Sequence, residues 1–334
     1  MTDPPSNGRF PPPPEPHLAP AIASPHPTPE PPAEVRFKVR YNVLLFVLTV
    51  ASVSYVGIVL WGSAWQFSAS LLLILTVHEF GHYLAARWHG VPSSLPYFLP
   101  LPILNPFGTL GAIILMPGRI RSRRALLDIG ASGPLAGMAV AVPLMVYGLS
   151  LSELGPRSSE NYVQEGQCLL YWALKAVVYG SIPPDQDVFL HPIAVAAWAG
   201  LFITFLNLLP VGQLDGGHVA YALFGERQNR LGRVVFFAPT ALLVYNAWTF
   251  GGPLVERALR EGWGRAWSAG WLTLVSALAP WILVQTLLAV ARRRGMLDHP
   301  PVDDVTLSTG RRAVAVVTLV LFVALFMPSP WVTF

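Results

Sequence analysis

The sequence has only one cysteine, Cys168, among its 334 residues. A single thiol cannot form a disulfide within the chain, and it cannot build a metal site from several thiolates. Charge is also scarce: Asp, Glu, Lys and Arg make up 12% of the residues, compared with about 25% in a typical soluble domain. The composition therefore argues against a soluble domain, and any metal site must use His and carboxylate side chains.

Hydrophobic residues make up 53% of the chain and are gathered into long runs. A helix needs about 20 predominantly apolar residues to cross a bilayer. Several runs reach or approach this length. They predict a polytopic membrane protein with spans at about residues 41–61, 67–89, 125–150, 191–209, 234–250, 269–291 and 313–327.

The basic residues are distributed unevenly between the segments that connect these spans. If the N-terminus is cytoplasmic, 17 of the 22 Lys and Arg residues lie on the cytoplasmic side, in agreement with the positive-inside rule. Because they flank apolar runs instead of forming one patch, the net charge of +4 does not indicate nucleic-acid binding. We expect a multi-pass protein embedded in the lipid bilayer, with a cytoplasmic N-terminus.

Residues 1–34 are rich in proline and nearly free of large apolar side chains. Such a segment cannot bury a core. It predicts a disordered cytoplasmic tail, or alternatively a ligand for a proline-binding partner. The membrane domain then comprises residues 35–334.

Residues 91–117 are apolar but contain six prolines, which exclude a regular helix. Non-helical backbone at membrane depth must be buried in protein or line a cavity. We therefore expect a re-entrant loop or hairpin, and a loop lying on the membrane surface is the alternative. Within it, the stretch PFGTLGAIILM at residues 106–116 reads as a glycine turn followed by a strand.

The run at residues 71–89 is apolar except for a few residues, among them His78, Glu79 and His82 in the sequence HEFGH. Ionisable residues inside a membrane helix are costly, so three together indicate function. His78 and His82 lie four apart, and thus on one face of a helix. In an HExxH helix the two imidazoles bind zinc and the Glu acts as general base on water. A chance match with packing histidines is the alternative, which the apolar surroundings disfavour.

A catalytic zinc site needs a third protein ligand. Asp215 is the only acid in FLNLLPVGQLDGGH, at residues 205–218, where Pro and Gly residues interrupt the helix. In the assigned topology Asp215 and HEFGH lie at similar depth towards the cytoplasm, which makes Asp215 the candidate ligand. The alternative is a helix-end acid that only meets water. His218 is a weaker candidate, expected at the interface or beside the site.

Together, HEFGH and NLLPVGQLDGG resemble the motifs of the site-2 protease family of intramembrane zinc metalloproteases, which pair HExxH with Asn-x-x-Pro-x-x-x-x-Asp-Gly. The likeness covers about residues 71–225 and is greatest to the branch of plastids, cyanobacteria and other bacteria that lacks a PDZ domain. It implies a location in the inner membrane of a bacterial cell. It implies an all-α polytopic membrane fold with a core of about six transmembrane helices plus a re-entrant hairpin or loop, to which a seventh C-terminal span is added. It also implies one zinc ion (Zn2+) on His78, His82 and Asp215, with Glu79 as the base.

The resemblance further implies a substrate and its contacts. Residues 35–334 would form a transmembrane metalloprotease domain that cleaves transmembrane or membrane-anchored proteins. By the family motif, Asn207 would bind the substrate backbone or the oxyanion. An unwound substrate could pair with the strand edge at Gly108, Thr109 and Gly111.

The rival class is a non-proteolytic membrane protein, since transporters and binding relatives also carry intramembrane His, Glu and Asp as relays. The internal repeat that many transporters contain is not visible in this sequence. A zinc enzyme with a Glu ligand is a further alternative, but Glu226, Glu256 and Glu261 lie in predicted loops.

Overall fold

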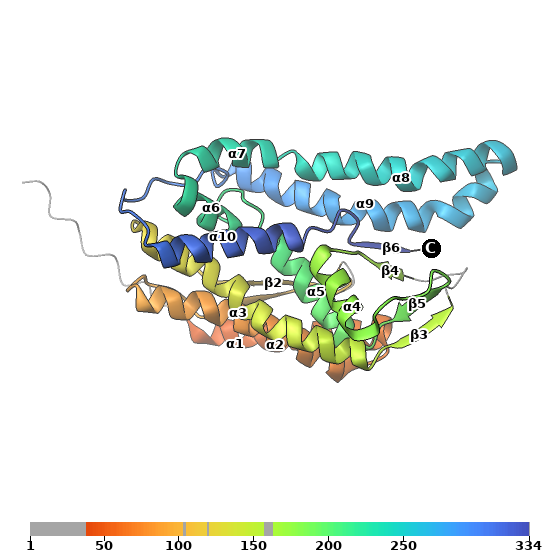
Figure 1. Ribbon diagram of the computed structural model, residues 1–334, viewed down its shortest axis with the longest axis horizontal. Coiled ribbons are helices and arrows are strands. Elements are labelled where there is room, and N and C mark those ends of the chain that lie inside the picture. Colours follow the sequence, from red (N-terminus) through yellow and green to blue (C-terminus); the bar gives the residue numbers. More distant parts are fainter. Residues whose placement is uncertain (1–37, 103–104, 119, 157–162, 334) are drawn as a thin grey trace, which may run out of the picture. The chain divides into compact units, whose positions relative to one another are not determined.

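Helices make up most of the chain that the computed structural model describes, namely residues 38–102, 105–118, 120–156 and 163–333 (Figure 1). This confirms the expected polytopic, mostly helical membrane protein, while the predicted tail at residues 1–34 lies outside the described residues. Within these described residues, five helical segments are long and apolar enough to cross a membrane: α1 (Val39–Trp61), α2 (Ala64–Trp88), α3 (Arg123–Ser150), α7 (Arg227–Val235) with α8 (Ala238–Glu261), and most of α9 (Trp263–Arg293).

Two further apolar helices lie where spans were predicted, but they are shorter than the five segments above. α5 (Pro192–Asn207) and α10 (Thr309–Ala324) have 16 residues each, fewer than the roughly 20 that a crossing needs. Proline bounds both of them, because α5 begins at Pro192 and Pro328 follows α10 closely. The count of membrane spans, six in the core and a seventh at the C-terminal end, therefore stays a prediction.

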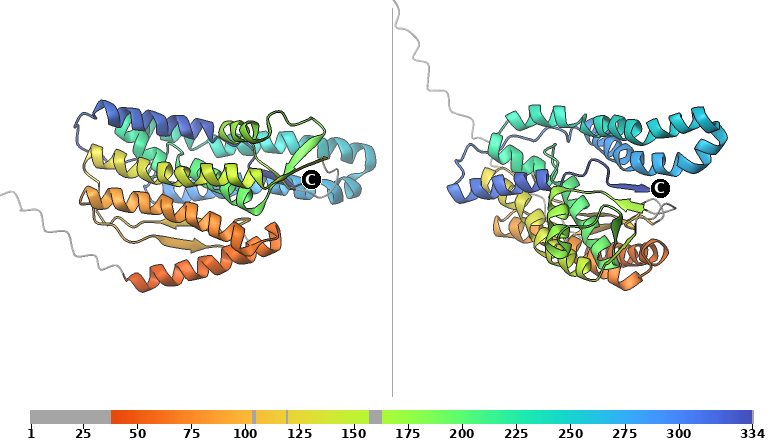
Figure 2. Two further views of the ribbon diagram at one scale, coloured as in Figure 1. Left: turned by 60° about the horizontal axis from the view of Figure 1, so that its bottom comes forward. Right: turned by 45° about the vertical axis from the view of Figure 1, so that its right-hand side comes forward.

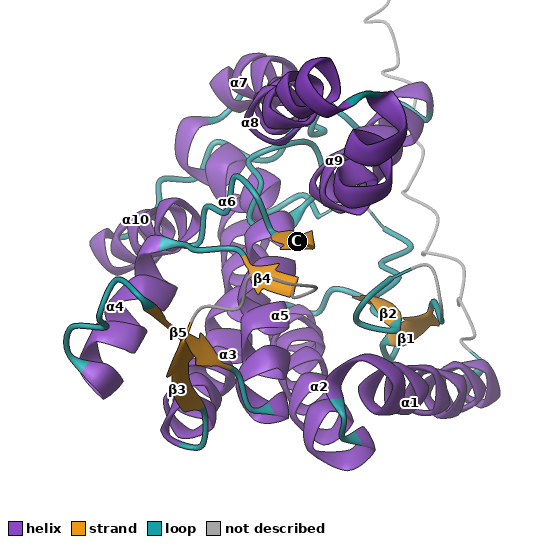
Figure 3. Cartoon of the chain, turned by 90° about the vertical axis from the view of Figure 1, so that its right-hand side faces the viewer, coloured by secondary structure: helices purple, strands orange, loops and turns teal. Residues whose placement is uncertain are grey.

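The short helix α5 lies among the other helices (Figure 3). Most of its side chains are buried, including Trp198, Phe202 and Phe205. A helix that is apolar on every side is stable when other elements surround it. Here α2 and α3 pack along α5, which makes it the core of the membrane domain.

The helices α2 and α3 form the most extensive helix pair in the described residues. A Cβ added to Gly81 on α2 would lie 2.6 Å from the carbonyl oxygen of Ser132 on α3. Only glycine permits this approach of the two backbones. The pair places the HEFGH segment of α2 directly against α3.

The segment between α2 and α3 forms the expected hairpin. β1 (Tyr97–Pro100) pairs antiparallel with β2 (Thr109–Ile113). Nδ2 of Asn42 donates to the carbonyl oxygen of Leu95 at 2.8 Å, and Oγ of Ser52 donates to that of Gly108 at 2.6 Å. The hairpin thus lies along the spanning helix α1, which supports the re-entrant interpretation over a loop on the membrane surface.

Two small sheets were not expected from the sequence, which makes the fold mostly helical instead of strictly all-α. Both are separate from the hairpin. In one sheet β3 (Glu153–Pro156) pairs with β5 (Gln186–Phe189), and in the other β4 (Val163–Glu165) pairs with β6 (Trp331–Thr333). The helix α4 (Leu169–Tyr179) lies between β4 and β5 in the chain.

The remaining helices follow a loop at residues 208–214. α6 (Asp215–Phe224) leads through α7 into α8, which packs against α9. α10 then returns to lie on α3 and α6 (Figures 1 and 2). This return brings the C-terminal part of the chain next to the helices that carry the sequence motifs.

Candidate metal centre

His78, His82 and Asp215 converge on one buried point. The Nε2 atoms of the two histidines lie 3.2 Å apart, and Oδ2 of Asp215 lies 3.3 Å from that of His78 and 3.2 Å from that of His82. Both imidazoles are buried. His78 and Asp215 meet here although they are 137 residues apart in the chain. The fold thus brings together the three residues that the two motifs singled out.

Asp215 is the first residue of α6, and the two glycines that follow it decide where this helix can lie. A Cβ at Gly216 or Gly217 would overlap the carbonyl groups of Leu208 and Gly212 in the preceding loop. Only glycine lets the first turn of α6 press against that loop, with the carboxylate turned towards α2. The side chain of Asp215 is 17% exposed, so it is not the water-facing acid of the alternative interpretation.

The donor atoms and their spacing fit a zinc ion. Two ligands bound at about 2.05 Å with a tetrahedral angle lie about 3.3 Å apart. The three donors here are separated by 3.2 to 3.3 Å. Two imidazoles and one carboxylate form a known catalytic zinc set that leaves a fourth position open. His78, His82 and Asp215 would therefore hold the metal.

The second ring nitrogen of His82 is held by α3. Nδ1 of His82 lies 2.7 Å from the carbonyl oxygen of Ile129. Because a carbonyl oxygen only accepts, Nδ1 carries the proton and Nε2 keeps its lone pair for a metal. The Ile129 carbonyl thus fixes both the tautomer and the orientation of the ring.

Two glycines on α3 make room for the imidazole rings. A Cβ on Gly133 would overlap the ring of His82, and one on Gly137 would lie 3.1 Å from Nδ1 of His78. Their spacing of four is typical of close helix packing. The structure shows that side chains of the metal site occupy the space these glycines leave.

Glu79 and Asn207 adjoin the same point. Glu79 is buried next to His78 on α2, and no hydrogen bond to its carboxylate is found in the part of the chain that is described. Asn207, the last residue of α5, has Nδ2 3.3 Å from Nε2 of His78, one of the metal donors. A carboxylate and an amide donor beside a metal position can move a proton and stabilise negative charge.

The predicted substrate residues of the hairpin lie against α1 and within the hairpin itself. Gly108 has φ +74°, and a Cβ there would lie 2.8 Å from the carbonyl oxygen of Ser52. Oγ1 of Thr109 donates to the carbonyl oxygen of Leu99 at 2.9 Å, and Gly111 has φ +94° with open space around it. Gly108 therefore has a packing role, and these residues are not part of the cluster of metal donors.

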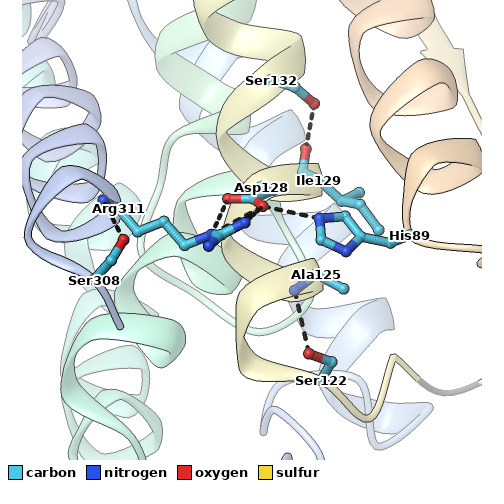
Figure 4. A network of polar contacts seen from close by, with 8 residues as sticks. All are labelled: His89, Ser122, Ala125, Asp128, Ile129, Ser132, Ser308 and Arg311. Atoms are coloured by element: carbon cyan, nitrogen blue, oxygen red, sulfur yellow. Dashed lines mark hydrogen bonds and ion pairs between the residues drawn. The ribbon is translucent and has the colours of Figure 1, made fainter. Parts of the chain in front are cut away.

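A polar cluster beside the metal site was missed by the sequence reasoning (Figure 4). Asp128 on α3 accepts hydrogen bonds from Arg311 near the start of α10 and lies 2.8 Å from Nε2 of His89, the residue after α2. An acid inside a predicted membrane span indicates a function or a partner. Asp128 could have been noticed on that ground, but its partners could not.

His218 lies on α6 without joining the metal donors. Its Nδ1 is 3.0 Å from Nε2 of His299, whose own Nδ1 donates to the carbonyl oxygen of Pro300 at 2.7 Å. Burial lowers the pKa of His218 to about 4, with a further contribution from the neighbouring His299, and burial also lowers the pKa of His299. Both rings are thus neutral at neutral pH, with Nδ1 of His218 donating to His299.

Comparison with known proteins agrees with this geometry. The chain matches the model of peptidase family M50 over residues 66–245, more than half of its length, and it belongs to this family, the site-2 protease family. The matched range contains all three candidate donors. No solved structure matches the chain.

The relatives that it resembles are plant proteins. The Probable zinc metalloprotease EGY1, chloroplastic, of Arabidopsis thaliana is 30% identical over 273 residues, which cover 80% of this chain and 43% of that protein. EGY1 of Oryza sativa subsp. japonica is 33% identical over 198 residues, covering 58% and 33%. EGY2 of Oryza sativa subsp. indica is 33% identical over 159 residues, covering 46% and 28%. The chain spans less than half the length of these relatives, whose names imply zinc as the metal.

Proposed function

We propose that the chain is an intramembrane zinc endopeptidase that hydrolyses peptide bonds of transmembrane or membrane-anchored proteins. The observation that supports this most is the donor set of His78, His82 and Asp215, whose spacing suits zinc. Two of these donors lie within α2, a helix that is apolar enough to cross a membrane. Peptide hydrolysis at this depth would act on substrates that enter the bilayer.

Each residue of the site has a role in this proposal. Bound zinc would act as a Lewis acid on the scissile carbonyl and lower the pKa of water. Glu79 accepts the proton of the attacking water and later passes it to the leaving amine. Nδ2 of Asn207 donates a hydrogen bond to the oxyanion or to the substrate backbone. Ile129 holds the proton of His82 on Nδ1 throughout.

The hairpin is the proposed binding surface for the unwound substrate strand. Only one edge of β2 is paired within the described residues, by β1. Thr109 and Gly111 belong to β2 and Gly108 directly precedes it, while the side chains of Leu110 and Ile113 are exposed. A photo-crosslinker at Leu110 or Ile113 should capture a membrane-anchored substrate, whereas one at Val317 on α10, which is at least as exposed, should not. Equal capture at all three positions would contradict the hairpin's role.

The orientation of the protein follows from its charge distribution. With 17 of 22 basic residues on one side, we infer a cytoplasmic N-terminus and a site near the cytoplasmic face. A bacterial inner membrane stays a prediction, because the relatives are chloroplastic plant proteins.

The deciding experiment compares the wild-type chain with Glu79→Gln in detergent or liposomes containing a single-pass test substrate. The proposal expects both proteins to retain about one zinc per chain, while Glu79→Gln loses cleavage by a factor of about 10² to 10⁴. A non-proteolytic membrane protein that uses these residues as a relay would cleave nothing in either form. Undiminished cleavage by Glu79→Gln would contradict the role of this residue.

A further inference from the structure

The turn of α3 that carries Ile129 is supported from outside the helix. Its neighbour Asp128 accepts two hydrogen bonds from Arg311, from Nε at 3.0 Å and from Nη2 at 2.7 Å. Nε2 of His89 lies 2.8 Å from the same carboxylate (Figure 4). Asp128 therefore links α3 to the end of α2 and to the start of α10.

This support matters because the hydrogen-bond ladder of α3 is incomplete at this turn. Pro134 lies inside α3 and has no N–H, so the carbonyl group of Gly130 lacks its helical partner. Two glycines, Gly130 and Gly133, add backbone freedom in the same stretch. Contacts outside the helix then help to hold the turn, and with it the carbonyl group of Ile129, which fixes His82 and also accepts from Oγ of Ser132 at 2.9 Å.

The strength of the contact fits such a task. Arg311 and Asp128 are 34% and 27% exposed, and the Arg–carboxylate contact uses two nitrogens of the guanidinium, a geometry that Lys cannot reproduce. The pair Arg257–Glu261 on α8 offers a comparison: its side chains are 53% and 44% exposed, and it joins residues of one helix. Exposed pairs of that kind contribute little to stability.

We propose that Asp128 is a positioning residue for the metal site and that Arg311 and His89 hold it in place. By fixing the turn of α3, Asp128 keeps the Ile129 carbonyl where it holds the proton on Nδ1 of His82, so that Nε2 points at the metal. This role rests on the proposed function of the site. Through Arg311, α10 would then contribute to the metal site, although α10 lies beyond residues 66–245, which the family model matches.

The test measures metal binding by the full chain, purified in detergent, and not only its activity. Zinc affinity is measured by competition with a chelator, the absorption spectrum of the cobalt(II)-loaded chain reports ligand geometry, and thermal unfolding of the metal-free chain reports folding. The variants are Asp128→Asn, Arg311→Gln and Arg311→Lys, with Arg257→Gln as the matched control.

We expect Asp128→Asn and Arg311→Gln each to lower zinc affinity by about tenfold and to change the cobalt spectrum, as loss of an outer support of a metal ligand does. Arg311→Lys keeps the positive charge but loses the two-nitrogen contact of the guanidinium. Its zinc affinity should lie between that of these variants and that of the wild type. A double variant that combines Asp128→Asn with Arg311→Gln should lose little more zinc affinity than either single variant, because both changes remove the same contact. Arg257→Gln should behave as the wild type.

Wild-type affinity and an unchanged spectrum in Asp128→Asn and Arg311→Gln would overturn the positioning role. Losses of affinity confined to variants whose thermal midpoint also falls would overturn it too, because the contact would then only stabilise the fold. If Asp128→Asn does not fold, Arg311→Lys decides between the same two results. Failure of the wild-type chain to bind zinc would instead overturn the proposed function, and the positioning role with it.

Discussion

Nε2 of His78 lies 3.3 Å from Oδ2 of Asp215, although 137 positions separate the two residues in the chain. A neutral imidazole and a carboxylate at this distance share a proton or a metal ion. The ring nitrogen of His82, 3.2 Å from the same oxygen, makes a metal the better explanation of the cluster. The site's integrity should therefore depend on all three side chains together.

The first prediction concerns Asp215. Replacement by Asn removes the anionic ligand while keeping the size of the side chain, so zinc affinity should fall by more than about 100-fold, beyond the effect of losing an outer support. Metal content after dialysis measures this. Asp304→Asn, which changes an exposed acid, is the control and should retain zinc. Full zinc content in Asp215→Asn would show that Asp215 is not a metal ligand and would contradict the three-donor site.

A second prediction concerns Gly133, where substitution by Ala should lower the stability of the chain instead of raising it. Gly→Ala in a helix normally stabilises by about 0.5–1 kcal/mol. At Gly133 the added Cβ would overlap the ring of His82. Gly133→Ala should destabilise the chain by about 1–3 kcal/mol and weaken zinc binding, as thermal unfolding and chelator competition would measure.

Gly252→Ala is the matched control for this change. Gly252 also lies in a helix, α8, but nothing lies within 4 Å of an added Cβ. It should be neutral or stabilising. Equal effects of the two substitutions would show that the space beside His82 is not limiting.

Asn207 should affect turnover more than metal binding. Its amide lies beside the metal position without being one of the three donors. Asn207→Ala should therefore keep zinc and lower kcat by about 10² to 10³, the usual cost of removing one oxyanion donor. Loss of zinc from this variant would mean that Asn207 mainly supports His78.

The pair His218–His299 predicts a pH dependence of stability. An unfolded histidine titrates near 6.5, whereas His218 in the folded chain has a pKa of about 4. Between these two values the unfolded state binds more protons than the folded state, so stability is complete above pH 6.5 and is lost progressively down to about pH 4.

Thermal unfolding of the chain between pH 8 and pH 4 measures this loss. His218→Gln lacks the titrating ring, so its midpoint should fall less than that of the wild type over the same range. An identical pH slope in both proteins would assign the loss to other groups.

The sequence indicated the candidate metal donors because its signals are local. HEFGH places two imidazoles on one helical face, and the family motif around Asp215 names the acid that could join them. Long apolar runs predicted the helices, and the prolines of residues 91–117 predicted a hairpin in place of a helix. Each of these inferences depends on the preferences of neighbouring residues.

Other features escaped because they join segments far apart. The pairing of β4 with β6 brings together residues 163–165 and 331–333, which have no mark of partnership in the sequence. The burial of α5 depends on the helices that surround it, which hydropathy alone does not reveal. The glycines of α3 could be read as packing residues, but not as space for His82.

What the sequence indicated by itself is the set of candidate groups: His78, Glu79 and His82 within five residues of one helix, and Asp215 in a glycine-rich break. The tertiary structure decided which groups surround them. Ile129 reaches His82 only because α2 and α3 approach closely at Gly81, and Arg311 reaches Asp128 only because α10 folds back onto α3. Local spacing sets which face a side chain lies on, whereas the partner of that face depends on how distant helices pack.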